Sequence, residues 1–459
     1  MKNKKYRIEK DSMGSMKVPA SSLYGAQTQR AIENFPISNI KFNRSFIYAI
    51  VIIKRSASIV NNKLGLLPQN KKNAIVNACD LILKGNYDNQ FPVDIFQTGS
   101  GTSTNMNVNE VVSQIASKKS KLTIHPNDDV NMGQSSNDTI PTAINISTST
   151  YIETDLLVNL DELIKSFKIK VKDFNSVIKI GRTHLQDATP ITLGQEFSGY
   201  TELLIKSRKR IALAQKILKR LPQGGTAVGT GINTHKNFGK LIAQEISKYT
   251  KLDFKESPNH FEAQSAQDCS VSISGDFKSL AVSLSKIAND LRWLGSGPRS
   301  GLGEIIIPAV QPGSSIMPGK VNPVICESML QVCSQVIAND LSITLGGLGS
   351  IFELNLMLPL IAHNLLFSAT ILSNSIKIFK DKLIDHIEVD EEKCENYIEG
   401  SLAMCTSLAP IIGYDKAASI AYESFKSGKT IREIMKNKKL IDEKLLNDLL
   451  NPENMIKPK

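Results

Sequence analysis

The stretch Phe277-Lys-Ser-Leu-Ala-Val-Ser-Leu-Ser-Lys-Ile-Ala-Asn-Asp-Leu291 carries the clearest structural signal in the chain. Its apolar residues return at intervals of three and four, which places them on one face of an α-helix. This face consists of Phe277, Leu280, Ala281, Leu284, Ile287, Ala288 and Leu291. The stretch therefore predicts a long helix that buries one side.

Three further segments show the same helical spacing. Their apolar positions are Ile152, Leu156, Leu160, Leu163 and Ile164; Leu204, Ile211, Ala214 and Leu218; and, after Pro323, Cys326, Leu330, Cys333, Ile337 and Leu341. Strand-like alternation is confined to Tyr6–Val18 and the short run Ile305–Ile307. Because long helices with such stripes pack side by side, we expect a mainly α protein with a long central helix bundle.

Segments rich in Gly, Ser and Asn interrupt the helical pattern. They span residues 97–109, 125–137, 181–195, 223–235 and 295–322. We expect these segments to be loops that carry function, since long irregular stretches in a compact helical protein usually do.

The composition is that of a folded protein of two or three domains. The chain has 459 residues, of which 41% are hydrophobic and 22% are charged, so it is not a disordered chain. Six scattered cysteines without a C-x-x-C pair predict reduced, mostly buried thiols. The N-terminal residues 1–14 lack the apolar core of a signal peptide. The run 354–376 lacks Asp, Glu, Lys and Arg but contains Asn, Pro and His, which favours a buried helix over a membrane span. We therefore expect a soluble, cytoplasmic protein.

The net charge of +11 does not indicate a nucleic-acid partner. Basic runs occur at Lys2–Lys5, Lys118–Lys121 and Lys436–Lys439, and aromatic residues do not interleave with them. A stacking platform for bases is therefore missing from the pattern. A solvated, lysine-rich surface is the simpler interpretation, and its mildly positive field would gather a small anion.

The segment Gly181-Arg-Thr-His-Leu-Gln-Asp187 places His184 in a polar stretch. The free imidazole pKa, about 6.5, suits proton transfer near neutrality. Taken alone, a histidine in such a segment is more often structural than catalytic. The other five histidines show no metal-ligand spacing, so we expect no metal site.

The segment Gly313-Ser-Ser-Ile-Met-Pro-Gly-Lys-Val-Asn-Pro323 has only a superficial likeness to a phosphate loop. Five residues, not four, separate its two glycines, and Val321 follows Lys320 where Ser or Thr is required. The run Gly229-Thr-Gly-Ile-Asn-Thr234 likewise lacks the third glycine of a dinucleotide fingerprint. What remains is a loop with two hydroxyls, an ammonium and a carboxamide ahead of a helix N-terminus, where backbone N–H groups favour an anion. A plain connection between helices is the alternative.

Two further clusters of small donors are Ser100-Gly-Thr102 and Ser135-Ser-Asn137. Each could serve as a helix N-cap, and Asn137-Asp138 could cap the next helix. Uncharged donors combined with one lysine suit a small carboxylate.

Several of these segments together resemble the fumarase/aspartase superfamily, whose signature loop is similar to Gly313–Pro323. The other similar segments are Gln97-Thr-Gly-Ser-Gly-Thr102, Asn105-Met-Asn-Val-Asn-Glu110, His125-Pro-Asn-Asp128 and Gln134-Ser-Ser-Asn-Asp138. The likeness extends from residues 7–13 to residues 412–416, which is nearly the whole chain. Gly181–Pro190 and Gly224–Asn233 resemble class II fumarate hydratase, whereas aspartases typically carry Gln where His184 stands.

The resemblance implies a mainly α fold of three domains. These would be an N-terminal lyase domain at residues 1–136, a central helical-bundle domain at 137–390 and a C-terminal fumarase domain at 391–459. Four subunits would form a homotetramer with a 20-helix core, and each active site would draw loops from three subunits.

The resemblance also implies the reaction, which is the reversible anti addition of water to fumarate to give (S)-malate in the tricarboxylic acid cycle, without cofactor or metal. Aspartate ammonia-lyase, or another lyase of the superfamily, is the alternative within the family. A protein retained for structure without turnover, as in lens crystallins, is the alternative outside enzymology. No nucleic acid and no membrane would be partners.

The roles of the site residues come from the same resemblance. The catalytic residues would be His184, Ser314 and Glu327. The substrate would be bound by Ser100, Gly101, Thr102, Ser135, Ser136, Asn137, Thr183, Ser315, Lys320, Val321 and Asn322. A secondary carboxylate site would consist of His125, Pro126, Asn127 and Asp128. Fumarases often carry Arg three residues before that histidine, but Leu122 stands here, so we expect weak binding at the secondary site.

Overall fold

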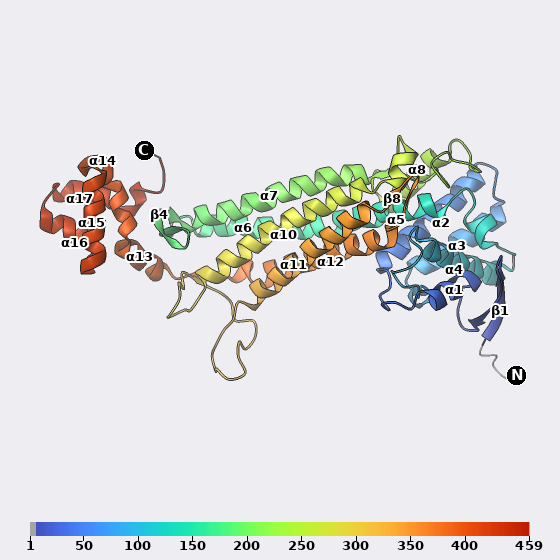
Figure 1. Cartoon of the computed structure of the whole chain (residues 1–459), viewed down its shortest axis with the longest axis horizontal. Helices are drawn as coiled ribbons and strands as arrows, with labels where there is room; N and C mark the ends of the chain where they lie inside the picture. The colour runs from blue at the N-terminus through green and yellow to red at the C-terminus, as the bar shows by residue number, and fades with distance from the viewer. Residues whose placement is uncertain (1–5, 459) are drawn as a thin grey trace. The chain divides into compact units, whose positions relative to one another are not determined.

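The computed structural model describes residues 6–458, and Figure 1 labels its elements. The chain divides into two compact units. Unit 1 comprises Met1–Val158, Lys209–Ala281 and Ser334–Ser373, and unit 2 comprises Asn159–Arg208, Val282–Cys333 and Asn374–Lys459. The basic run Lys2–Lys5 lies outside the described residues. The division into three domains at residues 136 and 390 stays a prediction.

Unit 1 contains most of the N-terminal elements. They are β1 (Tyr6–Asp11), β2 (Gly14–Pro19), α1 (Ala26–Asn34), α2 (Arg44–Lys63), α3 (Gln69–Leu83), η1 (Asp88–Gln90), α4 (Thr102–Ser120), η2 (Pro126–Val130), α5 (Ser136–Tyr151), η3 (Ile152–Leu156), β5 (Arg220–Leu221), α8 (Phe238–Thr250), β6 (Lys255–Glu256), α9 (His260–Ser265), β8 (Ser350–Ile351) and β9 (Leu354–Asn355). Helix α2 lies at the centre and packs against α3, α5 and α8.

Unit 2 contains the C-terminal elements and one hairpin. They are β3 (Ile178–Thr183), β4 (Gln186–Thr192), β7 (Ile305–Ile306), η4 (Ile384–His386), β10 (Glu388–Val389), α13 (Glu391–Gly400), η5 (Leu402–Ser407), α14 (Ala409–Ile412), α15 (Tyr414–Ser427), α16 (Ile431–Lys438), α17 (Glu443–Leu449) and η6 (Pro452–Asn454). The last helices share a core that includes Leu408, Ile420, Ile434 and Leu446.

Five long helices contribute residues to both units. They are α6 (Leu157–Asp173), α7 (Leu193–Leu218), α10 (Asp268–Leu294), α11 (Val324–Gly347) and α12 (Leu358–Lys382). Every described sheet has two strands, so the expectation of a mainly α fold is confirmed. Among residues 6–458, none of the helices is long and apolar enough to cross a membrane. The run 354–376 instead forms most of α12, whose Ile361, Leu365 and Leu372 are buried.

The predicted stripe at residues 277–291 is confirmed, because all seven of its apolar side chains on α10 are fully buried. The stripe of α11 was predicted incorrectly. Cys326 and Cys333 are buried, but Leu341 is 61% exposed and Ile337 40% exposed. The buried face of α11 runs instead through positions such as Val336 and Ile343. The helix is apolar on two faces, and spacing alone does not say which of them the subunit covers.

The predicted loops are confirmed in part. Residues 223–235 and 307–322 contain no helix or strand. Helix α4 already begins at Thr102, within the predicted loop 97–109. The segment 181–195 is mainly a β-hairpin rather than a loop. Of the six cysteines, all free, four are buried and two are half-buried, which agrees with the expected thiols.

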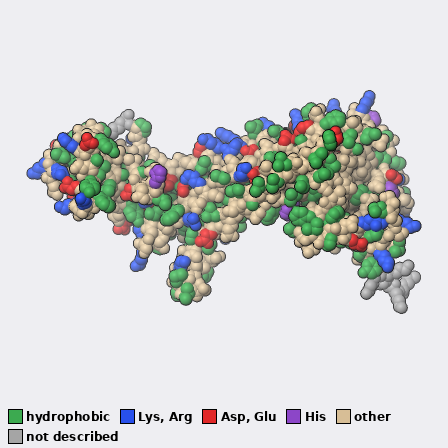
Figure 2. All heavy atoms as spheres, viewed as in Figure 1, with side chains coloured by type: hydrophobic (Ala, Val, Ile, Leu, Met, Phe, Trp, Pro, Cys, Tyr) green, Lys and Arg blue, Asp and Glu red, His purple; other side chains and the backbone are tan. Residues whose placement is uncertain are grey.

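Surface charge on the visible face of the molecule is mixed. In Figure 2, Lys and Arg side chains are scattered and intermingled with acidic ones. Two of the basic runs end helices, with Lys118 and Lys119 in the last turn of α4 and Lys436 and Lys438 in the last turn of α16. Cations at these ends complement the helix dipole, which gives these lysines a local structural role.

Candidate active site

His184 lies at the tip of the β3–β4 hairpin in unit 2. Thr183 pairs with Gln186, so His184 and Leu185 form a two-residue turn. Both turn residues have positive φ, 55° and 59°, as type I′ hairpin turns require. Asn-Gly is the usual pair in such turns, and a leucine in the left-handed region is strained. Strain of this kind is commonly found at functional sites.

The β3–β4 hairpin is anchored just behind its tip by a buried ion pair. The two terminal nitrogens of the Arg182 guanidinium lie 2.8 and 2.9 Å from the Glu304 carboxylate oxygens, and Glu304 is fully buried. Lys179 Nζ lies 3.5 Å from Glu304 and 3.2 Å from Glu196. Because breaking a buried pair leaves an uncompensated charge, these contacts hold the hairpin firmly beneath its exposed tip.

His184 lines a cavity of about 410 Å³ within unit 2. Lys179, Arg182 and Glu196 line the same cavity, together with Asp290 and other residues. Ser314 and Glu327 do not line it. The cavity has the size of a small-ligand site, and its basic residues, which include Lys286, outnumber its two acids, Glu196 and Asp290.

Ser314 lies in a loop of unit 2 that is closed by its own backbone. Gly313 N donates to Lys320 O at 2.9 Å, and Asn322 Nδ2 donates to Gly313 O at 2.7 Å. A Cβ on Gly313 would lie 2.3 Å from Lys320 O, so this closure requires glycine. Between these ties, Ser314 Oγ accepts hydrogen bonds from Ile316 N at 3.2 Å and Met317 N at 3.0 Å. Two backbone dipoles therefore favour negative charge on this oxygen.

The remaining predicted residues of unit 2 lie near this loop in the sequence. Ser315, Lys320 and Val321 are exposed, and Asn322 is half-buried. Glu327 is exposed in the first turn of α11. Among the described residues, no hydrogen bond or ion pair joins His184, Ser314 and Glu327 to one another.

Unit 1 holds a second group of predicted residues, at the N-terminus of α5. Ser135 is the N-cap, and it forms a capping box with Asp138. Ser136 Oγ accepts from Asn105 Nδ2 at 3.0 Å, and Asn137 Nδ2 donates to Ala227 O at 2.8 Å. The Ser135 and Ser136 oxygens thus act as acceptors in these contacts, which leaves their hydroxyl protons for a ligand.

The carboxylate of Asp138 links the loop at residues 224–226 to this turn through hydrogen bonds. This carboxylate accepts from Ser135 N, Gly224 N and Thr226 N at 2.9 to 3.0 Å. Burial raises the pKa of Asp138 to about 6, while these backbone donors and the Lys54 charge act in the opposite direction. The predicted N-cap in the Ser135-Ser-Asn137 cluster is confirmed at Ser135, and Asp138 takes part in the cap as the N3 residue of the capping box.

Ser100, Gly101 and Thr102 lie at the N-terminus of α4 in unit 1. Ser100 Oγ and Thr102 Oγ1 are 2.8 Å apart, and Gly101 is the N-cap with φ of 72°. Gly99 lies so near the backbone of Leu356 that a Cβ would meet its carbonyl oxygen at 2.1 Å. These hydroxyls therefore occupy a tightly packed helix start, where free N–H groups favour an anion.

Sequence reasoning missed Lys54, a buried lysine beneath the Ser135–Asn137 turn. Its Nζ donates to Asn131 Oδ1 at 2.8 Å and to Gln134 Oε1 at 2.9 Å. Burial lowers the pKa of Lys54 to about 7, which the nearby Asp138 charge opposes. The available signal was a lysine that directly follows the largely apolar stretch 46–53 of α2.

The predicted secondary carboxylate site is a short turn in unit 1. His125 Nδ1 lies 3.3 Å from Asn127 N, 3.1 Å from Asp128 N and 3.2 Å from the Asp128 carboxylate. His125, Asn127 and Asp128 are exposed, and Pro126 is half-buried. The exposed Asp128 carboxylate repels a second carboxylate at this turn, so the turn offers a dicarboxylate little attraction.

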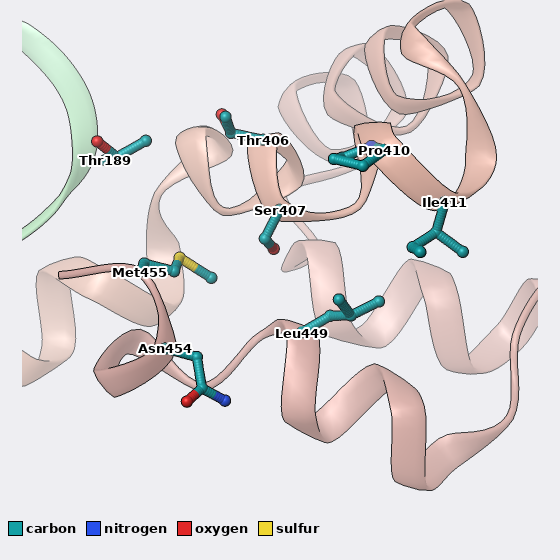
Figure 3. A pocket seen from close by; sticks show the side chains of 8 residues that line it. All are labelled: Thr189, Thr406, Ser407, Pro410, Ile411, Leu449, Asn454 and Met455. Carbon is teal, nitrogen blue, oxygen red and sulfur yellow. The ribbon is translucent and has the colours of Figure 1, made fainter. Parts of the chain in front are cut away.

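A different pocket, of about 380 Å³, lies among the C-terminal helices of unit 2. Figure 3 shows Thr189 of β4 facing side chains of the last helices across it. Its other lining residues are Thr406, Ser407, Pro410, Ile411, Leu449, Asn454 and Met455. None of these eight residues is charged, so the pocket does not suit a dicarboxylate. Among residues 6–458, no three His, Cys, Asp or Glu side chains gather in a way that could hold a metal ion.

Comparison with known proteins gives a consistent result. A family model described as "Lyase" matches residues 14–338, and one described as "Fumarase C C-terminus" matches residues 404–457. Proteins named fumarate hydratase class II from Bacillus anthracis and Bacillus subtilis are 48% and 47% identical over 459 residues, covering 99% of both chains in each case. A crystal structure of class II fumarase from Schistosoma mansoni matches with a TM-score of 0.96 at 40% identity, covering 98% of this chain and 99% of that one.

Proposed function

The chain belongs to the fumarase/aspartase superfamily and to its class II fumarate hydratase branch, and on this premise we propose that it is a fumarate hydratase. The reaction is the reversible anti addition of water to fumarate, which gives (S)-malate. The observation that carries the proposal is the full-length likeness to relatives that bear this name. His184 supports it, since aspartases typically carry Gln at that position.

In the dehydration direction, Ser314 removes a proton from the carbon next to a carboxylate. A free serine hydroxyl is far too weak an acid to ionise near pH 7. The two backbone N–H groups that meet Ser314 Oγ stabilise its anion, and exclusion of water by the loop would add to this. The proton-accepting oxygen is thus activated by its own loop.

Negative charge then accumulates on the neighbouring carboxylate, as an aci-carboxylate. Lys320 and Asn322 hold this carboxylate, and a site complementary to the intermediate lowers the barrier. The other donors bind the remaining carboxylate and the hydroxyl group: Ser100, Gly101, Thr102, Ser135, Ser136, Asn137, Thr183, Ser315 and Val321.

His184 acts on the oxygen side of the reaction. It protonates the departing hydroxyl, or activates the incoming water in the reverse direction, and Glu327 orients its ring. General acid–base steps of this kind contribute about 10²- to 10⁴-fold each. The strained turn of the hairpin supports this role, because it presents the imidazole to solvent and not to the core.

A homotetramer with shared active sites is part of the proposal. The hydrophobic residues Ile337, Leu341 and Leu345 of α11, and Leu348 just beyond its end, are 40 to 77% exposed, at intervals of three and four. An uncovered stripe of this kind suits helix packing against a second copy of the chain. The tetramer would be built on the proposed central domain at residues 137–390, with residues 1–136 and 391–459 as the flanking domains.

The proposal also covers the pathway, the compartment and the cofactor requirement of the enzyme. The enzyme would work in the tricarboxylic acid cycle, in the cytoplasm, and would need neither a cofactor nor a metal. Assays with and without a chelator such as EDTA test the last point. An activity lost on chelation and restored by one metal ion would contradict it.

The proposed activity is tested by ultraviolet absorbance of the fumarate double bond. We expect absorbance to rise with malate and to stay flat with aspartate. A response to aspartate would identify an ammonia-lyase, and no response to malate at any pH from 6 to 9 would indicate a protein without turnover.

The sharing of sites between subunits has its own test. His184→Asn and Ser314→Ala variants are each expected to be inactive alone. If the two groups of one site come from different subunits, unfolding and refolding the variants together restores part of the activity. Mixed tetramers without activity would contradict a shared site.

A further inference from the structure

The feature that the proposed reaction leaves unexplained is the buried ammonium of Lys54. Lysine is almost never fully buried unless it is paired, yet Lys54 is fully buried on α2. Within residues 6–458 no carboxylate forms an ion pair with it, and its Nζ donates to the neutral amides of Asn131 and Gln134. A buried charge without a counter-ion is costly, so its retention calls for a reason beyond folding.

The two amides link Lys54 to the donor turn. Gln134 directly precedes Ser135, and Asn131 Nδ2 donates to the Gln134 carbonyl at 3.1 Å. Asn131 Oδ1 also accepts from Asn105 Nδ2 at 3.3 Å. Asn105 in turn donates to Ser136 Oγ at 3.0 Å. A continuous set of hydrogen bonds therefore runs from the ammonium to the hydroxyls of the turn.

The charged groups around the Ser135–Asn137 turn are Asp138 and Lys54, and they differ in their hydrogen-bond partners. The donors Ser135, Ser136 and Asn137 are all uncharged. The acid of this region, Asp138, directs its carboxylate at the backbone N–H groups of Ser135, Gly224 and Thr226. Its charge is thus stabilised mainly by these backbone donors, whereas Lys54 has the Asp138 charge nearby but no ion pair with it.

We propose that Lys54 is the positioning residue of the Ser135–Asn137 turn, and that its buried ammonium is the counter-charge for the substrate carboxylate that this turn binds. The inference rests on the proposed function and adds a residue to its binding site. Lys54 acts through Asn131 and Gln134 and does not touch the substrate.

Proton linkage follows from this arrangement. Burial lowers the pKa of Lys54 to about 7, so at pH 8 the free enzyme carries it mostly neutral. A bound carboxylate would favour the charged form, and the site would take up a proton on binding. The titratable groups facing Lys54 are Asp138 on α5 and Cys79 on α3, and burial keeps the Cys79 thiol protonated by raising its pKa. Helix α4 and residues 131–134 contribute uncharged amide side chains to this network and no further titratable group.

The test uses the full-length enzyme and succinate, the saturated analogue that cannot react. Titration calorimetry at pH 8, in two buffers of different ionisation enthalpy, gives the protons taken up per site. We expect uptake approaching one proton in the wild type and none in Lys54→Met. The KM for fumarate should rise roughly 10- to 100-fold in Lys54→Met, because one charge-assisted contact stabilises the complex by a corresponding amount. The change in kcat should be smaller. Lys54→Arg, which keeps the charge, should recover part of the KM.

A matched control removes a lysine that has a partner. Lys278 pairs with the buried Asp340 at 2.6 Å in the same unit. Lys278→Met should lower stability and leave both KM and proton uptake unchanged within about twofold. Proton uptake or KM that is unaltered in Lys54→Met would overturn the inference while the hydratase activity stands. If Lys54→Met does not fold, absence of proton uptake in the wild type overturns it equally well. A wild type without hydratase activity would instead reject the proposed function.

Discussion

The two units of the chain hold their proposed functional groups in opposite ways. In unit 1, Ser135 and Ser136 belong to a helix N-terminus supported from below by a buried polar network. In unit 2, His184 is an exposed residue at a hairpin tip, and Ser314 lies on a loop whose hydrogen bonds are all its own. The first group rests on a buried polar network, and the second lies on an exposed hairpin tip and on a half-buried residue of a loop.

The difference matches the two tasks of a hydratase. Groups that bind a carboxylate gain from being fixed in advance, since ordering them at the moment of binding costs free energy. Groups that transfer protons must approach and leave the reacting atoms and exclude water, which suits tips and loops. Substitutions of the proton-transferring groups of unit 2 should therefore change kcat, and substitutions in the Ser135–Asn137 turn of unit 1 should change KM and stability.

The largest effect is expected at Ser314. Ser314→Ala removes the proton-accepting oxygen, and kcat should fall by about 10²- to 10⁴-fold with KM within a few-fold. Steady-state absorbance assays with malate measure both constants. Ser283→Ala serves as a control elsewhere in unit 2, with kcat expected to be unchanged. A Ser314→Ala enzyme with more than a tenth of the wild-type kcat would place the base elsewhere.

A pH effect in unit 1 should come next. The folded pKa of Lys54 is about 7 and its ordinary value is 10.5, so between these values the unfolded chain binds more protons than the folded one. Between these two pKa values, the unfolding free energy of the wild type should rise with pH relative to that of Lys54→Met, by about 1.4 kcal/mol per pH unit. The stability gained in this way is lost as pH falls to 7, and below pH 7 the difference between the two proteins no longer depends on pH. Urea titrations from pH 7 to 9.5 measure it. Parallel pH curves for the two proteins would show that Lys54 titrates normally.

Lys320 should give an intermediate effect in unit 2. Lys320→Met removes a charged contact to the carboxylate that gains charge, so kcat/KM should fall at least 10- to 100-fold. Its side chain is exposed, so the melting temperature should stay within a degree or two. A lower melting temperature with normal kcat/KM would assign Lys320 a structural role.

Substitution of Ser135 distinguishes a role in substrate binding from a role in helix capping. Ser135→Ala should cost about 1 kcal/mol of unfolding free energy through loss of the N-cap, and should raise KM about two- to tenfold through loss of a neutral donor. Thr430 forms the same capping box on α16 in unit 2. Thr430→Ala should cost the same stability and leave KM unchanged. Equal KM values in the two variants would show that Ser135 only caps the helix.

The smallest effect concerns the strained turn. Leu185 has φ of 59° and is 66% exposed. Because Asn tolerates the left-handed region, Leu185→Asn should raise the unfolding free energy by roughly 1 kcal/mol and change kcat less than twofold. Thermal melts and assays check both. Lower stability would show that the leucine side chain is packed in a way that compensates for the backbone.

The sequence predicted the helices well because their apolar spacing is local. It failed on α11, where two faces are apolar and a covering partner is needed to choose between them. It treated the His184 segment as a loop, since His-Leu is not a usual pair for a two-residue turn. The hairpin forms because Ile180 packs in the C-terminal core and Arg182 reaches Glu304, which are contacts distant in sequence.

The site residues were predicted from their resemblance to a family and not from spacing. The structure adds local reasons for several of them, such as the backbone donors at Ser314 and the capping box of Ser135. Lys54 could not be predicted from the sequence, because its proposed role depends on its burial and on hydrogen-bond partners about 80 residues away along the chain.

The most direct measurement is proton NMR of fumarate incubated with the purified protein in D2O. Hydration by a base and an acid on opposite faces of the substrate predicts malate that carries a single deuterium on C3, with the one coupling constant that anti addition gives. No conversion of fumarate, or a mixture of the two diastereomers of malate with one deuterium on C3 from the first turnovers, would contradict a hydratase with His184 and Ser314 in these roles.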